Sequence, residues 1–319
     1  MIEIISATAL ATVQDLGRHG SLGYGVGTSG AMDNLSLILG NLLLGNDEGA
    51  AAIEIPLFPF EARFIEACAF AVTGAACGAT LDGQALPPNW VAQASAGQVL
   101  KLNYPSAGSR AYLCLAGGVD VPEVLGSRST QLRGEFGGLN GRMLQQGDRL
   151  PAGRPGKAGN SDFGVRLATR ALPLEVDGVP AMRVLPAAEY DCFSAEAQAA
   201  FWAGEWKVTT QSNRYGYRLE GQPLLPEKPL EVRSHGIVPG VIQVPHGGQP
   251  IIQMRDAQPS GGYPKFGTVI EADLWRLGQA PIGSRVRFIH CSYAQALDAL
   301  EANRAFLDAT RRLLTLHSL

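Results

Sequence analysis

The sequence of 319 residues has no excess of charge of either sign and no long apolar run near its start. Lys and Arg number 26 against 29 for Asp and Glu, which gives a net charge of -3. A protein that neutralises many phosphates needs a basic surface, so nucleic acid is not an expected partner. The opening stretch MIEIISATALATVQD has neither a basic segment nor a long apolar one. We therefore expect a cytoplasmic protein without a membrane partner.

Cysteine and histidine are scarce and scattered. The cysteines are odd in number, lie far apart and never form a C-x-x-C pair, and the five histidines form no H-x-x-x-H pair. This pattern favours small buried thiols in a reducing compartment and predicts no metal site. The cysteines are Cys68, Cys77, Cys114, Cys192 and Cys291.

Several motifs of common enzymes are missing or incomplete. No G-x-S-x-G occurs, which leaves serine hydrolase chemistry unsupported, and GRPGKAG at 153–159 lacks the glycine and hydroxyl positions of a phosphate loop. A formal G-x-G-x-x-G spans 25–30, but the polar, glycine-rich segment before it is unlike the buried strand of a dinucleotide fold.

What remains at 25–33 is a loop in front of a helix, where backbone N–H groups favour an anion. We assign Ser29 and Gly30 to substrate binding and Asp33, expected in the first helical turn, to catalysis. The alternative for Asp33 is that it only complements the helix dipole.

The rest of the chain predicts a mainly β fold, built as β-barrels. Gly (39) and Pro (20) interrupt short apolar or alternating runs such as CAFAVTG, GQVLKLNY, EWKVTT and SRVRFIHC. Helices are expected at 32–45, apolar nearly all round, and from Ser292, which stands at capping-box spacing from Gln295. In this C-terminal helix Leu297, Leu300 and Leu307 should share one face, opposite a solvated charged face.

An internal repeat indicates two related β-barrel domains. Four segments of the first half match four of the second in the same order, including GQVLKL from Gly97 with GVIQV from Gly240. We expect domains at 1–158 and 159–319, with the polar stretch 156–162 as their link. The strand and turn at 256–264 should then have a counterpart at 115–122.

Residues 256–268, DAQPSGGYPKFGT, concentrate polar groups at such a turn. Asp256 could act as a general base or a metal ligand, and Lys265 could stabilise developing charge, so we assign both to catalysis. Further residues are assigned to substrate binding. The guanidinium of Arg214 could hold a carboxylate or a phosphate, and Gln258 with the Gly261 and Gly262 amides could orient an amide or a carboxylate. The residues assigned to substrate binding here are Arg214, Gln258, Gly261, Gly262 and Tyr263.

Several stretches together resemble the biotin-dependent carboxyltransferase family, which is also called allophanate hydrolase subunit 2 or antikinase-like. They are TVQDLGRHG, GTSGAMDN, GGLNGRMLQQGDRL, SNRYGYRLEG and the run from SHGIVPG to FGTVIEADL. The resemblance covers about residues 1 to 300 and is greatest to the branch that forms part of bacterial ATP-dependent 5-oxoprolinases. It implies two cyclophilin-like β-barrels, in agreement with the repeat.

The resemblance also implies partners and co-substrates. A 5-oxoprolinase would combine this chain, as a hetero-oligomer, with a kinase-inhibitor-like protein, its B-type subunit, and with a third protein, its A-type subunit. This chain and the B-type subunit would activate 5-oxo-L-proline with ATP and Mg²⁺, as a phosphorylated lactam, and the A-type subunit would complete ring opening to L-glutamate. ATP and Mg²⁺ would be held with the B-type partner.

Two other functions stay open. The family commonly shows QTTGGYP where this chain has QPSGGYP, so the substrate could differ. One alternative is a carboxyltransferase component that acts on urea or an amide. No Met-Lys biotin acceptor occurs, so biotin would arrive on another chain. The other alternative is a non-catalytic antikinase-type regulator, which would not need a polar pocket.

Overall fold

The computed structural model describes residues 1–155, 163–164, 174–228 and 230–317. The fold is mainly β, as the sequence predicts, and no helix in the described ranges is long and apolar enough to cross a membrane. The expected link at 156–162 and the boundary between 158 and 159 lie outside the described residues, so the domain limits stay a prediction.

The chain divides into two compact units, and each combines segments that are distant in sequence. The first comprises Met1–His19, Ser29–Ala168 and Ala305–Leu319, and the second comprises Gly20–Thr28 and Thr169–Arg304.

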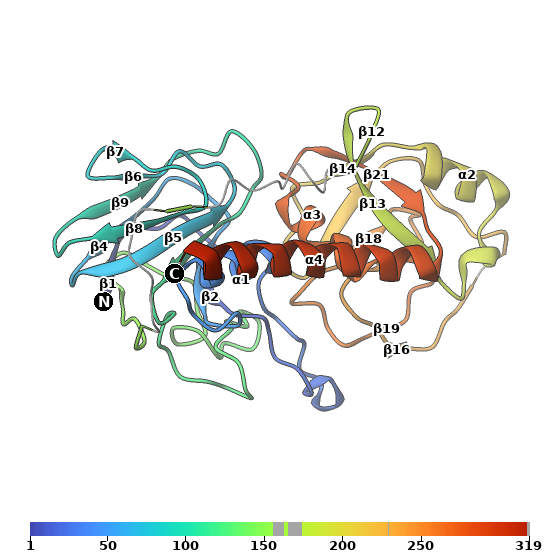
Figure 1. Ribbon diagram of the computed structural model, residues 1–319. Helices are drawn as coiled ribbons and strands as arrows, with labels where there is room; N and C mark the ends of the chain where they lie inside the picture. The colour runs from blue at the N-terminus through green and yellow to red at the C-terminus, as the bar shows by residue number, and fades with distance from the viewer. Residues whose placement is uncertain (156–162, 165–173, 229, 318–319) are drawn as a thin grey trace. The chain divides into compact units, whose positions relative to one another are not determined.

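The described strands of the first unit form two antiparallel sheets (Figure 1). The six-stranded sheet has the order β11-β1-β4-β9-β6-β7, and the five-stranded sheet has the order β2-β3-β10-β5-β8. The strands are β1 (Ile2–Ser6), β2 (Thr12–Gln14), β3 (Ala52–Ile55), β4 (Phe60–Phe64), β5 (Cys68–Gly74), β6 (Thr80–Leu81), β7 (Gln84–Ala85), β8 (Trp90–Ala94), β9 (Val99–Leu102), β10 (Ala111–Leu115) and β11 (Arg149–Leu150).

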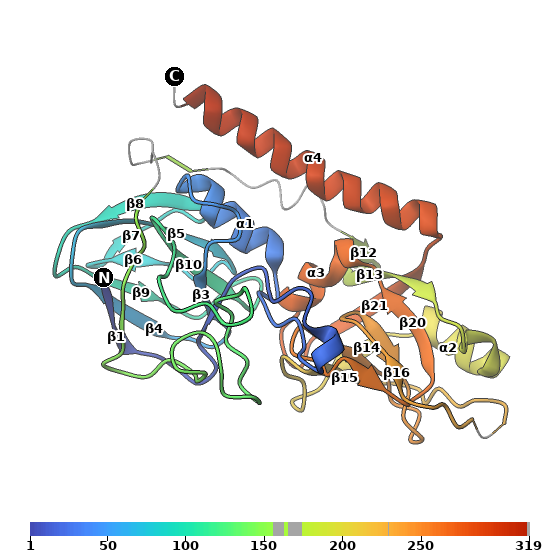
Figure 2. The same cartoon turned by 90° about the horizontal axis from the view of Figure 1, so that it is seen from below.

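One core fills the space between these sheets, and a helix covers the other face of the five-stranded sheet. Phe60 of β4 and Leu113 of β10 are fully buried in the core. The neighbouring positions Tyr112 and Cys114 point the opposite way and pack against helix α1 (Asn34–Leu43), which lies beside β5 and β10 (Figure 2). Gly40 permits this approach, because a Cβ there would lie 2.4 Å from Cys114 Sγ. The predicted buried helix is thus confirmed.

The second unit contains a closed barrel of seven strands, with β12 added at its edge. The order is β13-β20-β17-β18-β15-β14-β21, and the parallel pairing of β21 with β13 closes the ring. The strands are β12 (Glu175–Val176), β13 (Val179–Pro186), β14 (Trp206–Val208), β15 (Gly216–Glu220), β17 (Val241–Gln243), β18 (Ile251–Gln253), β20 (Lys265–Val269) and β21 (Arg285–His290); β16 (His235–Gly236) and β19 (Ser260–Gly261) form a separate pair.

Two short helices and part of a long one complete the second unit. They are α2 (Ala195–Ala203), α3 (Leu274–Gln279) and the start of α4 (Tyr293–His317), with 3-10 turns at Leu22–Tyr24, Tyr190–Cys192 and Glu271–Asp273. The capping box of α4 is confirmed: Ser292 N donates to Gln295 Oε1 at 2.8 Å, and Gln295 N donates to Ser292 Oγ at 3.2 Å.

The buried face of α4 differs from the predicted one. Leu307 is buried, but Leu297 is 45% exposed, and Ala299 and Asn303 are buried in its place. The small side chain of Ala299 packs against Ile270 and Cys291, and Asn303 Nδ2 donates to the backbone oxygen of Ala272. The leucine spacing therefore predicted the helix correctly, but it predicted the wrong buried face.

The segments matched by the internal repeat are strands in both units, but they do not pair alike. β5 pairs with β10 in the first unit, whereas their matched counterparts β14 and β18 both pair with β15 and not with each other. A turn does follow both β10 and β18, as the repeat predicts. The repeat therefore locates the strands and this turn, but it does not give the sheet order.

Candidate functional site

A pocket of about 240 Å³ lies on the outer face of the second unit's barrel, over β15, β17 and β18. Neighbouring residues of a strand point to opposite faces of a sheet. Tyr217, Ile242 and Ile252 are fully buried on the core side. The adjacent positions Arg218, Gln243 and Gln253 line the pocket instead.

The pocket wall is rich in side-chain amides. Gln253 Nε2 donates to Gln243 Oε1 at 3.1 Å, and Gln243 Nε2 donates to the backbone oxygen of Tyr263 at 3.4 Å. Gly261 makes room for this chain of amides, since a Cβ at that position would lie 2.5 Å from Gln243 Nε2. A primary amide offers both donor and acceptor, so such a wall can bind another amide. The amide side chains that line the pocket are Gln211, Asn213, Gln243, Gln253 and Gln258.

Four residues that the sequence assigned to substrate binding meet at this pocket. Gln258, Gly261, Gly262 and Tyr263 all line it, from the loop that follows β18 and from β19. Tyr263 is 44% exposed, and its ring meets that of His246 edge-on at a centroid distance of 6.2 Å. The loop thus forms one wall of the pocket.

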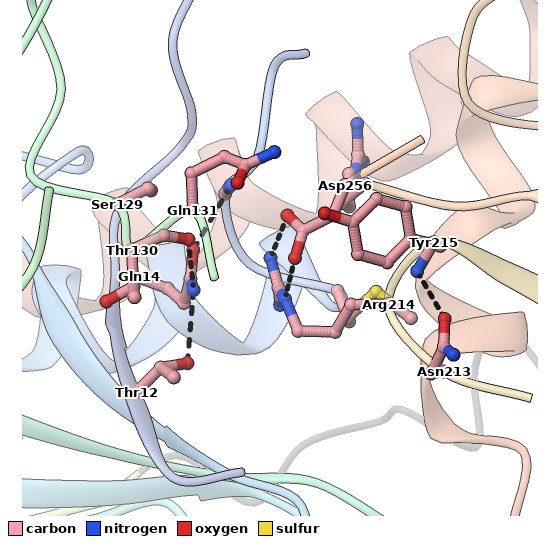
Figure 3. Close-up of polar contacts among 12 residues, drawn as sticks. Thr12, Gln14, Ser129, Thr130, Gln131, Asn213, Arg214, Tyr215 and Asp256 are labelled. Carbon is pink, nitrogen blue, oxygen red and sulfur yellow. Dashed lines mark hydrogen bonds and ion pairs between the residues drawn. The ribbon is translucent and has the colours of Figure 1, made fainter. Parts of the chain in front are cut away.

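Asp256 and Arg214 form a buried ion pair beside the same loop (Figure 3). Arg214 Nε donates to Asp256 Oδ2 at 2.8 Å, and Nη2 donates to Oδ1 at 3.0 Å. Asp256 N also donates to the Arg214 backbone oxygen at 2.9 Å, and the side chains of Arg214 and Asp256 are only 7% and 1% exposed. The guanidinium that we expected to hold a carboxylate or a phosphate of the substrate therefore holds a carboxylate of its own chain, and the pair fixes the turn after β18.

Lys265 lies at the start of β20, opposite Gln243 in the sheet register. Its Nζ forms an ion pair with Glu189 Oε2 at 3.2 Å and contacts His235 Nε2. His235 Nδ1 lies 2.8 Å from the backbone oxygen of Arg233, and His235 pairs with the pocket residue Gly261 in the β16–β19 ladder. The Lys265 ammonium is thus held in position beside the pocket wall. Lys265 and its contact His235 pair in the sheets with the pocket residues Gln243 and Gly261.

The residues assigned at the other predicted loop belong to the first unit. Asp33 is the N-cap of α1 and does not lie in its first turn: its carboxylate accepts from Ser36 N at 3.0 Å and from Ser36 Oγ at 2.5 Å. Gly30 N donates to Gln14 Oε1 at 3.2 Å, and a Cβ on Gly30 would lie 2.9 Å from the Gly17 backbone. These contacts correct the expected anion site, because the side chains of Gln14 and Asp33 already accept hydrogen bonds from backbone N–H groups that an anion would need.

A buried network stabilises this turn from the sheet below. Glu54 Oε2 accepts from Met32 N at 2.8 Å and from Tyr112 Oη at 2.7 Å, and Tyr112 Oη accepts from Asp33 N at 2.8 Å. Burial, followed by the charges of Glu54 and Asp33, raises the pKa of the Tyr112 hydroxyl well above its usual value. Ser29 Oγ is buried and makes no hydrogen bond within the described ranges, so its role stays a prediction.

Sequence reasoning missed several residues that the structure places at the pocket or beside Lys265. Arg218 follows the buried Tyr217 in GYRLEG, and Gln243 follows the buried Ile242 in GVIQV, so alternation within these strands could have indicated both. Glu189 offers no such signal, because it reaches Lys265 from a loop 76 residues away.

The cysteines are all free, and the described residues contain no group of three or more His, Cys, Asp or Glu arranged for a metal ion. Cys77, Cys114 and Cys291 are buried, as expected, and Cys68 is partly buried. Cys192 is exposed, which corrects the expectation of burial, since it lies in the 3-10 turn between β13 and α2.

The comparisons with known proteins agree on one family. Residues 24–290 match the model described as "Carboxyltransferase domain, subdomain A and B". The protein named as the C subunit of 5-oxoprolinase in Escherichia coli is 44% identical over 308 residues, 97% of each chain, and its namesake in Haemophilus influenzae is 42% identical over 98% of each. The crystal structure of K. lactis urea amidolyase superposes with a TM-score of 0.88 at 32% identity, over 97% of this chain and 20% of that one.

Proposed function

Because the chain belongs to the family of carboxyltransferase domains with subdomains A and B, we propose that it is the C-type subunit of an ATP-dependent 5-oxoprolinase. Both bacterial relatives of that name match over nearly their whole length. In this proposal the chain works in a complex with the B-type and A-type subunits, and ATP with Mg²⁺ is held with the B-type partner. No biotin is attached to this chain, and the free thiols fit a cytoplasmic complex.

The amide-lined pocket is the observation that carries the proposal. The ring of 5-oxo-L-proline has one amide N–H and one amide carbonyl, which complement the acceptor and donor of a glutamine side chain. Gln243 and Gln253 are held in place by their mutual hydrogen bond, so the pocket is ordered before a substrate arrives. A volume of about 240 Å³ suits a small ring better than a large ligand.

The proposed chemistry activates the ring amide before the ring opens. The lactam oxygen attacks the γ-phosphorus of ATP, and ADP leaves as the new O–P bond forms. Water then adds to the activated ring carbon, and the C–N bond breaks to give the free amine of a γ-acyl phosphate. A second water hydrolyses this acyl phosphate to phosphate and the side-chain carboxylate of L-glutamate. Lys265, positioned by Glu189, supplies positive charge for the phosphorylated oxygen. Asp256 and Arg214 position the loop through their ion pair.

Reconstitution tests the proposal. The purified chain alone is expected to show no 5-oxoproline-dependent ATP hydrolysis, whereas the mixture with the B-type and A-type subunits should release ADP, phosphate and L-glutamate. Activity of the isolated chain, or an inactive mixture of all three proteins, would contradict the proposal. As a matched pair, Gln258→Leu should lower activity in the mixture, and Gln84→Leu, on an exposed strand of the first unit, should not.

The second candidate is a carboxyltransferase component for urea or another amide. The superposition on urea amidolyase favours it, because the match extends over almost the whole of this chain. Transfer of carboxylate from carboxybiotin to urea by the chain, with no response to 5-oxo-L-proline, would support this function. Binding of the B-type protein without turnover of either substrate would support the antikinase-type role.

A further inference from the structure

Arg218 is the only charged side chain among the described residues that line the pocket. It lies in β15 between Tyr217 and Leu219, which are 0% and 1% exposed, so its own side chain points outward. Its backbone is fixed, because Arg218 N donates to Ser212 Oγ at 2.9 Å and its carbonyl accepts from Thr209 N at 2.9 Å. A rigid strand therefore presents a guanidinium to the pocket.

The two arginines of the SNRYGYRLEG segment differ in what binds them. Arg214 is buried and its guanidinium is engaged by both oxygens of Asp256. Arg218 is exposed, and within the described ranges no carboxylate pairs with its guanidinium. An arginine fork binds a carboxylate through two parallel hydrogen bonds. The arginine available for an external carboxylate is thus Arg218.

The wall around Arg218 completes a two-part recognition site. Arg218 pairs with Ile251 in the sheet register, and Ile251 pairs in turn with Gln243, so these three line one face in a row. The amide of Gln243 at one end of this row and the guanidinium of Arg218 at the other suit a small molecule that carries both a cyclic amide and a carboxylate. Urea has the amide character but no charge, so it would leave the guanidinium unpaired.

We propose that Arg218 binds the carboxylate of the substrate and thereby selects a small anionic lactam over neutral amides. This inference rests on the proposed function, and it adds the residue that determines specificity. The ion pair should strengthen where a partner protein covers the pocket, because excluding water lowers the screening of charges.

The test uses the reconstituted complex with Arg218→Gln, Arg218→Lys and a control, Arg285→Gln. Arg285 is an exposed arginine of β21 that pairs with Glu205 and does not line the pocket. Losing a charge-assisted pair should raise the KM for 5-oxo-L-proline by about tenfold or more in Arg218→Gln. Inhibition by the neutral lactam 2-pyrrolidinone should stay unchanged. Arg218→Lys should be intermediate, and Arg285→Gln should behave as the parent.

The outcomes separate this inference from the proposed function. An unchanged KM in Arg218→Gln would overturn the role of Arg218 while leaving the proposed function standing. So would an equal weakening of the affinities for 5-oxo-L-proline and 2-pyrrolidinone. If the parent complex lacks 5-oxoproline-dependent ATP hydrolysis, the proposed function fails. Calorimetry on the same complex then decides about Arg218: preferential binding of 5-oxo-L-proline that Arg218→Gln removes supports the inference, and equal or absent binding of the two lactams overturns it.

Discussion

Asp256 and Arg214 show how an ion pair can fix the loop beside a binding pocket. Both side chains are almost fully buried, and two parallel hydrogen bonds join them. Burying two charges is costly, and their attraction offsets that cost only while both are present. The pair therefore holds the start of the loop that carries Gln258 and Tyr263 to the pocket.

Asp256→Asn should destabilise the protein as well as lower activity. It leaves the Arg214 charge buried with a neutral partner, and breaking a buried pair costs about 3–5 kcal/mol. Denaturant unfolding should show this as a lower midpoint. The double variant Arg214→Met, Asp256→Leu removes both charges and should recover much of the stability. A loss of turnover in Asp256→Asn at parental stability would instead support direct catalysis by this carboxylate.

At the scale of an element, the start of α1 resembles an anion-binding site, but side chains of the same chain accept the hydrogen bonds that an anion would accept. Asp33 accepts two hydrogen bonds from Ser36 as the N-cap, and Glu54 accepts the Met32 amide from the sheet below. A carboxylate at this end of a helix satisfies free N–H groups and complements the dipole. Two carboxylates of the chain thus take the place that an external anion would have.

Asp33→Asn separates a capping role from a catalytic one. Asn caps helices about as well as Asp, so stability and activity of the reconstituted complex should both stay close to those of the parent. Asp33→Ala removes the cap and should cost about 1 kcal/mol or more, measured by denaturant unfolding. If Asp33→Asn folds normally but is inactive, the carboxylate is needed for catalysis.

At the scale of the whole molecule, buried thiols make the fold sensitive to alkaline pH. Burial raises the pKa of Cys77 to about 11 and that of Cys114 to about 12, from 9.0. Each of these thiols has a higher pKa in the folded state than in the unfolded state. Its contribution to stability is therefore complete below about pH 9 and is lost as pH rises through the folded-state pKa. Unfolding of the chain releases these thiols to ionise.

The free energy of unfolding should therefore fall between about pH 9 and pH 11, with each such thiol contributing about 1.4 kcal/mol per pH unit at most. Cys114→Ala should start from a lower stability, because it leaves a cavity beside Gly40, but should show a shallower decline over this range. Denaturant unfolding at several pH values measures both slopes. Equal slopes would show that Cys114 does not ionise on unfolding.

The sequence by itself determined the features that depend on local pattern. Alternation and turn residues gave the mainly β fold, apolar residues gave α1, and Ser292 with Gln295 gave the start of α4, because each of these signals acts over a few residues. The ordered motifs also gave the family, which the comparisons confirm.

Only the tertiary structure decided which polar groups are available to a substrate. Arg214 meets Asp256 across 42 residues and Lys265 meets Glu189 across 76, and no local pattern encodes such pairings. The same holds for strand order, since the repeat located strands but not their neighbours. Whether a charge binds a ligand or its own chain depends on what packing brings within hydrogen-bond distance, and here that leaves Arg218 facing the pocket.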